Sequence, residues 1–510
     1  MSPLGQSHRV QVHEPQVHGN EARFSWSVTP ETELYERCDF TLSFPVEFDL
    51  GTVPRSLWWR MAIVCLHPQW AILRPCRVEL PISLGARERE FWVRLIDNAA
   101  VQLEAYGSAP RPRRSVQLVD EGPPLAPERL RVDPERAAVA FSGGKDSMVL
   151  AALLAELTER PLLVMSSSPV GWVGDHSGAA RERLQREIAT RLPVELVEVR
   201  SDYRTSWDPR FSLRDGCRLQ VHELSDLPVF QAATIIAAAV RGVGRAFMAS
   251  EADIQYNAPG PAGVVLHSEF ASCAVSQGAL DALMRPFGIR QGSLSYPLHM
   301  PQVQALLLHR YPQLIDLQLS CWQAPEGTRS CGGCPKCFQI ALVALSEGFD
   351  PRRLGIDPVS VLCAYGDWSL ASPAQHGQPP LHPTRSARHH VVRCLQQMPT
   401  DVVAAALAGD SRRPRDPRLG EAIAVYARLR ANALALHVPP APGYIGGLLE
   451  LVEPQLRGRL RAIFDEYFEP AAPEEFAEIL ARSRGLTEWI VEPLECQPDR
   501  PGRGDMGRVA

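Results

Sequence analysis

Short apolar runs alternate with amphipathic, helix-like patterns through the middle of the chain. The predicted strands are 137–141, 162–165, 194–199 and 246–249, and the predicted helices are 147–158, 178–191 and 228–241. Strands that alternate with helices predict a parallel sheet covered by helices on both faces. We therefore predict an α/β domain over residues 134–350.

The flanking regions follow other patterns. Before the α/β domain, alternating runs at 23–28, 77–80 and 91–96 predict strands, so residues 1–106 are expected to form a β-rich or α+β domain. The Pro- and Arg-rich stretch 107–133 is interpreted as a linker. Residues 351–496 carry mostly helical patterns, and the Pro/Arg/Gly-rich tail 497–510 is expected to be disordered.

Length and composition narrow the function classes. A chain of 510 residues is long enough for several domains. Its net charge of −5, without a basic block, makes nucleic-acid binding unlikely. No secretory signal or bilayer-length apolar stretch stands out, so no membrane partner is expected and a cytoplasmic location is predicted. There the 12 cysteines would be mostly reduced, and a tight cluster of them predicts a metal site.

The motif with the clearest chemistry directly follows the first strand of the α/β domain and opens a helix. It comprises Ser142, Gly143, Gly144, Lys145, Asp146 and Ser147. Two glycines allow a sharp bend, and the backbone amides at a helix N-terminus form a site for a phosphate. The serine hydroxyls and the Lys145 ammonium can add contacts, and Asp146 stands where it could help to hold Mg²⁺. The spacing is not that of the common nucleoside-triphosphatase loop.

A second motif lies near the end of the α/β domain. Four cysteines follow a C-x9-C-x2-C-x2-C spacing, with two glycines in the turn: Cys321, Cys331, Cys334 and Cys337. Thiolates at this spacing can share one tetrahedral zinc ion, and four of them make a closed structural site. Sulfur-transfer or redox chemistry is the alternative, and four clustered cysteines favour structural Zn²⁺.

The sequence SGGKDS at 142–147 resembles the PP-loop signature of the ATP pyrophosphatases, an adenine nucleotide α-hydrolase-like fold. The resemblance implies that ATP is cleaved between its α and β phosphates, that AMP passes to a substrate oxygen and that pyrophosphate is released. It assigns ATP binding to the six residues of the loop, with Ser142, Lys145 and Asp146 as catalytic residues and Mg²⁺ as cofactor.

With the cysteine motif added, residues 137–350 resemble 7-cyano-7-deazaguanine synthase of queuosine biosynthesis. The match rests on SGGKDS, on SCW followed by SCGGCPKC over 320–337, and on Tyr296-Pro297-Leu298 before them. The resemblance implies activation of a 7-deazaguanine carboxylic acid with ATP, followed by attack of ammonia and conversion to a nitrile. Typical synthases are shorter. They carry an Arg-Asn pair at the place where this chain has the sequence DLPVFQ, residues 226–231.

Long proteins with this core resemble synthase-like members of bacterial anti-phage defence operons. That branch implies a C–N ligase that forms an amide between a deazaguanine acid and an amine of a partner protein from the same operon. Nitrile formation, and tRNA thiolation by a PP-loop enzyme, are the alternatives.

Several further residues are candidates on their position alone. Glu251 and Asp253 follow the fourth strand at the ligand-binding end of the sheet, and one of them is expected to contact the substrate. Asp175-His176 follow the second strand and are weaker candidates for ATP contact. His389-His390 are interpreted as a solvated or core pair rather than as ligands.

Overall fold

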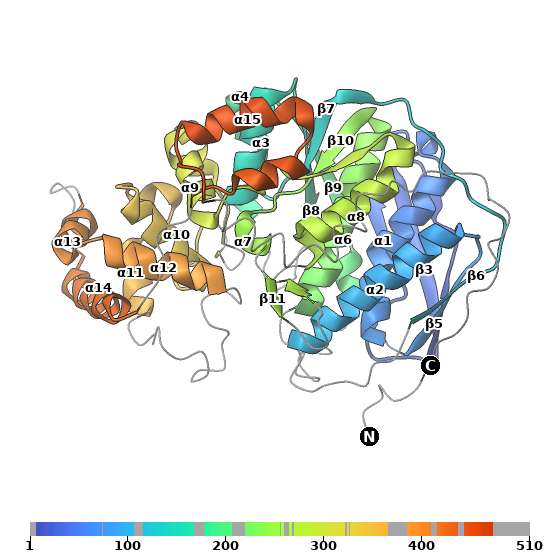
Figure 1. Ribbon diagram of the computed structural model, residues 1–510, viewed down its shortest axis with the longest axis horizontal. Coiled ribbons are helices and arrows are strands. Elements are labelled where there is room, and N and C mark those ends of the chain that lie inside the picture. The colour runs from blue at the N-terminus through green and yellow to red at the C-terminus, as the bar shows by residue number, and fades with distance from the viewer. Residues whose placement is uncertain are drawn as a thin grey trace.

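The computed structural model (Figure 1) describes residues 7–73, 75–106, 116–167, 178–206, 220–255, 257–259, 265–267, 270–321, 324–325, 327–365, 385–409, 416–436 and 443–472. A twisted sheet lies between layers of helices, and a smaller helical lobe stands beside it. The fold is thus α/β with a large mixed sheet.

Eleven strands form one sheet, in the order β13-β10-β7-β8-β9-β4-β3-β1-β5-β6, with β2 paired to β3. The strands β13 to β9 pair in parallel, and β4 joins β9 antiparallel. The bounds are β1 (His8–Val12), β2 (Gln16–His18), β3 (Glu21–Thr29), β4 (Asp39–Ser43), β5 (Cys76–Leu80), β6 (Val116–Asp120), β7 (Asp133–Ala140), β8 (Leu162–Ser167), β9 (Glu195–Ser201), β10 (Val243–Phe247) and β13 (Arg290–Gly292), with β11 (Asn257–Pro259) and β12 (Val265–His267) as a separate pair.

Helices cover the sheet and build the lobe. They are α1 (Arg55–Leu73), α2 (Ala86–Tyr106), α3 (Lys145–Leu157), α4 (Gly178–Arg191), α6 (Gln220–Val240), α7 (Ala252–Gln255), α8 (Ala274–Met284), α9 (Met300–His309), α10 (Pro335–Ser346), α11 (Pro358–Ala364), α12 (Arg385–Gln397), α13 (Thr400–Ala408), α14 (Leu419–Leu434) and α15 (Pro454–Asp465). The 3₁₀ turns are η2 (Leu50–Thr52), η3 (Tyr203–Ser206), η5 (Phe270–Ser272), η6 (Arg285–Phe287), η7 (Pro312–Leu317), η8 (Pro351–Leu354) and η9 (Gly446–Leu451).

The parallel strands are buried on both faces because successive side chains point to opposite sides of a sheet. In β7, Ala137 and Val139 pack with α3, α9 and α15, whereas Ala138 packs with α1, α6 and α8. These two helical layers explain why the strands of this part read as continuous apolar runs. Among the described residues, no helix combines the length and the apolar character that crossing a bilayer requires.

The N-terminal strands extend the same sheet, since Leu42 and Ser43 of β4 pair with Ser201 and Arg200 of β9. The predicted strand 91–96 is wrong, because it lies inside α2. The run of apolar letters in its six residues fits either period, but the burial of Phe91, Trp92, Leu95, Ile96 and Ala99 follows the spacing of a helix. The predicted linker 107–133 contains β6, which pairs with β5; residues 107–115 lie outside the described part.

The helical C-terminal region divides into two parts. The helices α10 to α14 share one core, which forms the lobe at the left of Figure 1. Residues 443–472 return to the sheet instead, where the Arg459 guanidinium donates to the carbonyls of Glu156 and Leu157 in α3. Arg245 of β10 is buried and pairs with Glu453 at 2.5 Å. The tail 497–510 lies outside the described residues.

Candidate functional site

The strand order changes direction between β7 and β10. The chain continues from β7 to β8 and β9 on one side, whereas β10 and β13 lie on the other. Ligands of open α/β sheets bind outside the carboxyl ends of the strands at such a switch point. The segments that leave these two strands are 141–144, which leads into α3, and 248–251, which leads into α7. The glycine-rich loop and the segment that carries Glu251 therefore meet at the place where this topology favours a ligand.

The glycine-rich loop makes its turn at Gly143, which has a φ of +79°. A Cβ at this position would lie 2.3 Å from the Cδ2 atom of Leu184, so both the conformation and the space demand glycine. Gly144 is the N-cap of α3 and has an ordinary φ of −71°. The loop thus brings the first turn of α3 directly behind the carboxyl end of β7.

Hydroxyl groups already bond to several backbone amides of this loop. The Ser147 hydroxyl accepts from the amide of Ser142 at 3.3 Å, and the Ser142 hydroxyl accepts from the amide of Gly144 at 3.4 Å. The amide of Lys145 donates to the Ser320 hydroxyl at 3.1 Å. The contacts of the Ser142 and Gly144 amides are long, so an entering phosphate oxygen could replace those two hydroxyls as acceptor.

Lys145 is buried with only 4% of its surface exposed, and its ammonium bonds to two carboxylates. Glu251 lies 2.9 Å from the Lys145 Nζ atom, across the switch point, and Asp146 is the second partner. Burial lowers the pKa of Lys145, but the two carboxylates outweigh it and hold the pKa above its usual range. Burial raises the pKa of Glu251 well above its usual range. Burial opposes ionisation of Asp146 too, yet Lys145 holds the pKa of that carboxyl below its usual range.

Asp253 is committed to a different network. Its Oδ1 atom lies 2.9 Å from His299 Nδ1 and 3.0 Å from His390 Nε2, and its Oδ2 accepts the Met300 amide at 2.7 Å. Burial acts to raise the pKa of Asp253, but the two histidines hold it well below its usual range. The glycine-rich loop 142–147 is called the phosphate loop below, after its predicted role. Of the two residues predicted after the fourth strand, Glu251 therefore faces this loop and Asp253 faces the histidines.

The three ligand-type atoms of Asp253, His299 and His390 lie within 4.8 Å of one another. Such a set could hold a metal ion, but Arg393 donates to His390 Nδ1 at 3.3 Å. A neutral imidazole has one lone pair and arginine cannot accept, so His390 Nε2 carries the proton. Nε2 donates this proton to Asp253. In this arrangement the three side chains form a hydrogen-bonded network rather than a set of metal ligands.

The four cysteines of the second motif gather round one point and could hold a metal ion. Their sulfur atoms lie 3.7 Å apart for Cys321 and Cys334, 3.9 Å for Cys331 and Cys337, and 3.4 Å for Cys334 and Cys337. A tetrahedral ion with bonds of about 2.3 Å needs sulfur–sulfur spacings of about 3.8 Å. The donor set therefore fits zinc in both number and spacing.

The cysteine site and the phosphate loop share one segment of chain. Leu319 donates its amide to the carbonyl of Gly143 at 2.7 Å, and Ser320 accepts the amide of Lys145. Cys321 is the next residue. The two motifs are far apart in the sequence, but the segment 319–321 contacts the glycine-rich loop and also supplies the first cysteine.

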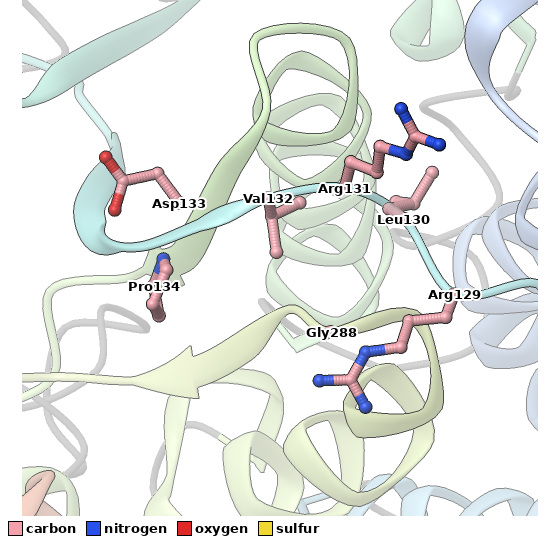
Figure 2. Close-up of a pocket in the computed structure, with 7 residues that line it drawn as sticks. All are labelled: Arg129, Leu130, Arg131, Val132, Asp133, Pro134 and Gly288. Carbon is pink, nitrogen blue, oxygen red and sulfur yellow. The ribbon is translucent and has the colours of Figure 1, made fainter.

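An open hollow at the other end of the sheet is a separate feature (Figure 2). Arg129 to Pro134, at the amino end of β7, line it together with Gly288. The side chains of Arg129 and Arg131 diverge in Figure 2 rather than converge on one point. The hollow is thus neither near the phosphate loop nor built around a ligand.

Sequence reasoning missed three residues of this region. Ser320 directly precedes a predicted metal-binding cysteine, so the sequence indicated the region. It did not indicate the contact of Ser320 with Lys145. His299 carried no motif, and for His390 the sequence left a solvated and a core position open and indicated no partner, whereas the structure buries it. The candidates Asp175-His176 lie outside the described residues, and residues 226–231 lie within α6.

Comparison of this chain with models of protein families, with curated protein sequences and with solved structures gave no match.

The two glycines of the loop should respond differently to alanine. Gly143→Ala forces a left-handed conformation and displaces Leu184, so we expect a loss of about 2 kcal/mol or more in the free energy of unfolding. Gly144→Ala keeps an allowed φ, and its Cβ would meet the Ser142 hydroxyl at 3.5 Å and the Leu319 carbonyl at 3.8 Å, both ordinary contacts, so its cost should stay below about 1 kcal/mol. Urea denaturation of both variants measures the difference, and equal losses would contradict the loop geometry.

The purified chain should contain one zinc ion, held by the four cysteines. Cys334→Ser should lose the ion and several kcal/mol of stability, because binding of a structural metal contributes directly to folding. Cys363→Ser, outside the cluster, is the matched control and should keep the ion. Elemental analysis with thermal unfolding measures both; iron, or a second equivalent of metal, would show that these assignments are wrong.

Proposed function

We propose that this chain is an ATP-dependent C–N ligase. The carboxylate of a substrate acid attacks the α-phosphorus of ATP, which forms an acyl-adenylate and releases pyrophosphate. An amine then attacks the acyl carbon, so that an amide forms and AMP leaves. The substrate class we infer is a 7-deazaguanine carboxylic acid, after the resemblance of the two motifs.

The observation that carries the proposal is the Lys145–Glu251 pair across the switch point. A buried ammonium at the base of a glycine-rich turn, next to a helix N-terminus, is an arrangement suited to phosphate. The SGGKDS sequence supplies the resemblance to enzymes that release pyrophosphate rather than phosphate.

Each residue of the loop has a distinct part in this proposal. The Lys145 ammonium and the amides of Ser142 and Gly144 bind phosphate oxygens, while the hydroxyls of Ser142 and Ser147 orient them. Asp146, whose side chain is 31% exposed, would hold the Mg²⁺ ion, which neutralises phosphate charge when bound. The carboxylate chemistry of Asp146 fits that ion.

The four cysteines hold Zn²⁺ in this proposal and take no part in the reaction. Their thiols gather round one point, which favours a closed metal site over sulfur transfer to tRNA. An amine on a partner protein is the proposed nucleophile, because the flanking regions exceed what a small free base needs. Ammonia, with a nitrile as the final product, is the second candidate, supported by the motif resemblance alone.

The first test is the identity of the products. With ATP, Mg²⁺ and a 7-deazaguanine carboxylic acid, we expect pyrophosphate and AMP. Ser142→Ala and Asp146→Asn should each lower the rate by about a hundredfold or more, since preorganised contacts to the phosphates are lost. Asp350→Asn, at an exposed carboxylate that caps the N-terminus of η8, is the matched control. Formation of ADP and phosphate alone would overturn the proposed reaction.

The second test identifies the nucleophile. The chain is incubated with ATP, Mg²⁺, the acid and either ammonium or the partner proteins encoded beside it, and intact mass spectrometry follows each protein. We expect a partner to gain the mass of the acid minus water. Nitrile formation with ammonium and no adduct on any partner would assign the metabolic reaction instead.

A further inference from the structure

The segment 250–255 is held tightly from several directions. The Ser250 amide donates to the Ser293 hydroxyl at 3.1 Å, and the Ala252 amide donates to the carbonyl of Leu298 at 2.7 Å. Within this segment, Glu251 bonds to Lys145 of the phosphate loop, and Asp253 follows two residues later. Asp253 and Glu251 thus lie two residues apart on one short segment, and Glu251 is one of the two carboxylates that hold Lys145.

The helical lobe contributes one of the three donors that hold Asp253. His390 lies on α12, is 4% exposed and donates from Nε2 to Asp253 Oδ1, 137 residues away in sequence. Arg393, one turn further on the same helix, donates to His390 Nδ1 and thereby fixes the tautomer that donates. Figure 1 places α12 and α7 next to each other at the boundary between the lobe and the sheet.

We propose that His390 is a positioning residue for the phosphate-loop site: it holds Asp253, and through the segment 250–255 it keeps Glu251 against Lys145. The inference rests on the proposed nucleotide site for its effect on catalysis, but not for its effect on the segment itself. It gives the lobe, through α12, a part in the geometry of the site. A hydrogen bond to a buried carboxylate is strong, so its loss should be felt at Glu251.

The test uses two amides that differ only in reach. In the full-length chain, His390→Gln places a donor close to where Nε2 stands, whereas the shorter side chain of His390→Asn cannot reach Asp253. Gln396→Ala is the control on the same helix: Gln396 donates to the carbonyls of Ala433 and Leu436 in the lobe and does not touch Asp253.

We expect amide hydrogen exchange across 250–255 to accelerate on the order of tenfold in His390→Asn and to stay close to wild type in the other two variants. With ATP and the substrate acid, His390→Asn should raise KM for ATP and lower kcat/KM on the order of tenfold, whereas mere loss of folded protein would leave KM unchanged.

Unchanged exchange in His390→Asn would overturn the proposal. Equal defects in His390→Gln and His390→Asn, together with a second metal equivalent in the wild-type chain, would overturn it in favour of metal ligation. If the wild-type chain releases no pyrophosphate, the proposed function fails, and hydrogen exchange alone still decides whether His390 holds the segment.

Discussion

The phosphate loop depends on a neighbouring segment to keep its shape. Gly143 is held by the Leu319 amide and Lys145 by the Ser320 hydroxyl, and both come just before the first residue of the four-cysteine cluster. A left-handed glycine and a helix start without a side-chain cap are weak structures by themselves. A metal ion bound by the four cysteines would fix residue 321 and with it the chain that supports the loop. Removal of such an ion should therefore disturb the loop before it disturbs the sheet.

The buried charges set a second constraint. Lys145 faces Asp146 and Glu251, so the positive charge that a phosphate would seek is already shared by two carboxyl groups. A polyphosphate can bind here only if Glu251 gives up the ammonium, or if a divalent cation enters with it and takes the carboxylates. Burial, which raises the pKa of Glu251, works against a charged carboxyl left without Lys145. Free ATP and its magnesium complex should consequently differ in their affinity for the site.

The local patterns of the sequence predicted the α/β part well. The helix expected at 178–191 has those bounds, and the strands at 137–141 and 162–165 correspond to β7 and β8, since apolar runs flanked by turns depend on local sequence. The helix at 91–96 was mistaken for a strand because six residues cannot separate the two periods. Pairing of β4 with β9 depends on contacts between distant residues, and no single-sequence pattern reports it. The bond between His390 and Asp253 was beyond prediction for the same reason.

The two flanking regions stand in different relations to the site. The N-terminal strands join the sheet at β9, which lies two strands away from β7 and its phosphate loop. They therefore extend the sheet without contributing a strand to the switch point between β7 and β10. The C-terminal residues instead approach α7 from two sides: His390 bonds to Asp253, and Ile445 and Leu448 pack with Ala252 and Tyr296. Substitutions in the N-terminal strands should then act through stability, whereas those around α7 should act on the geometry of Glu251 and Lys145.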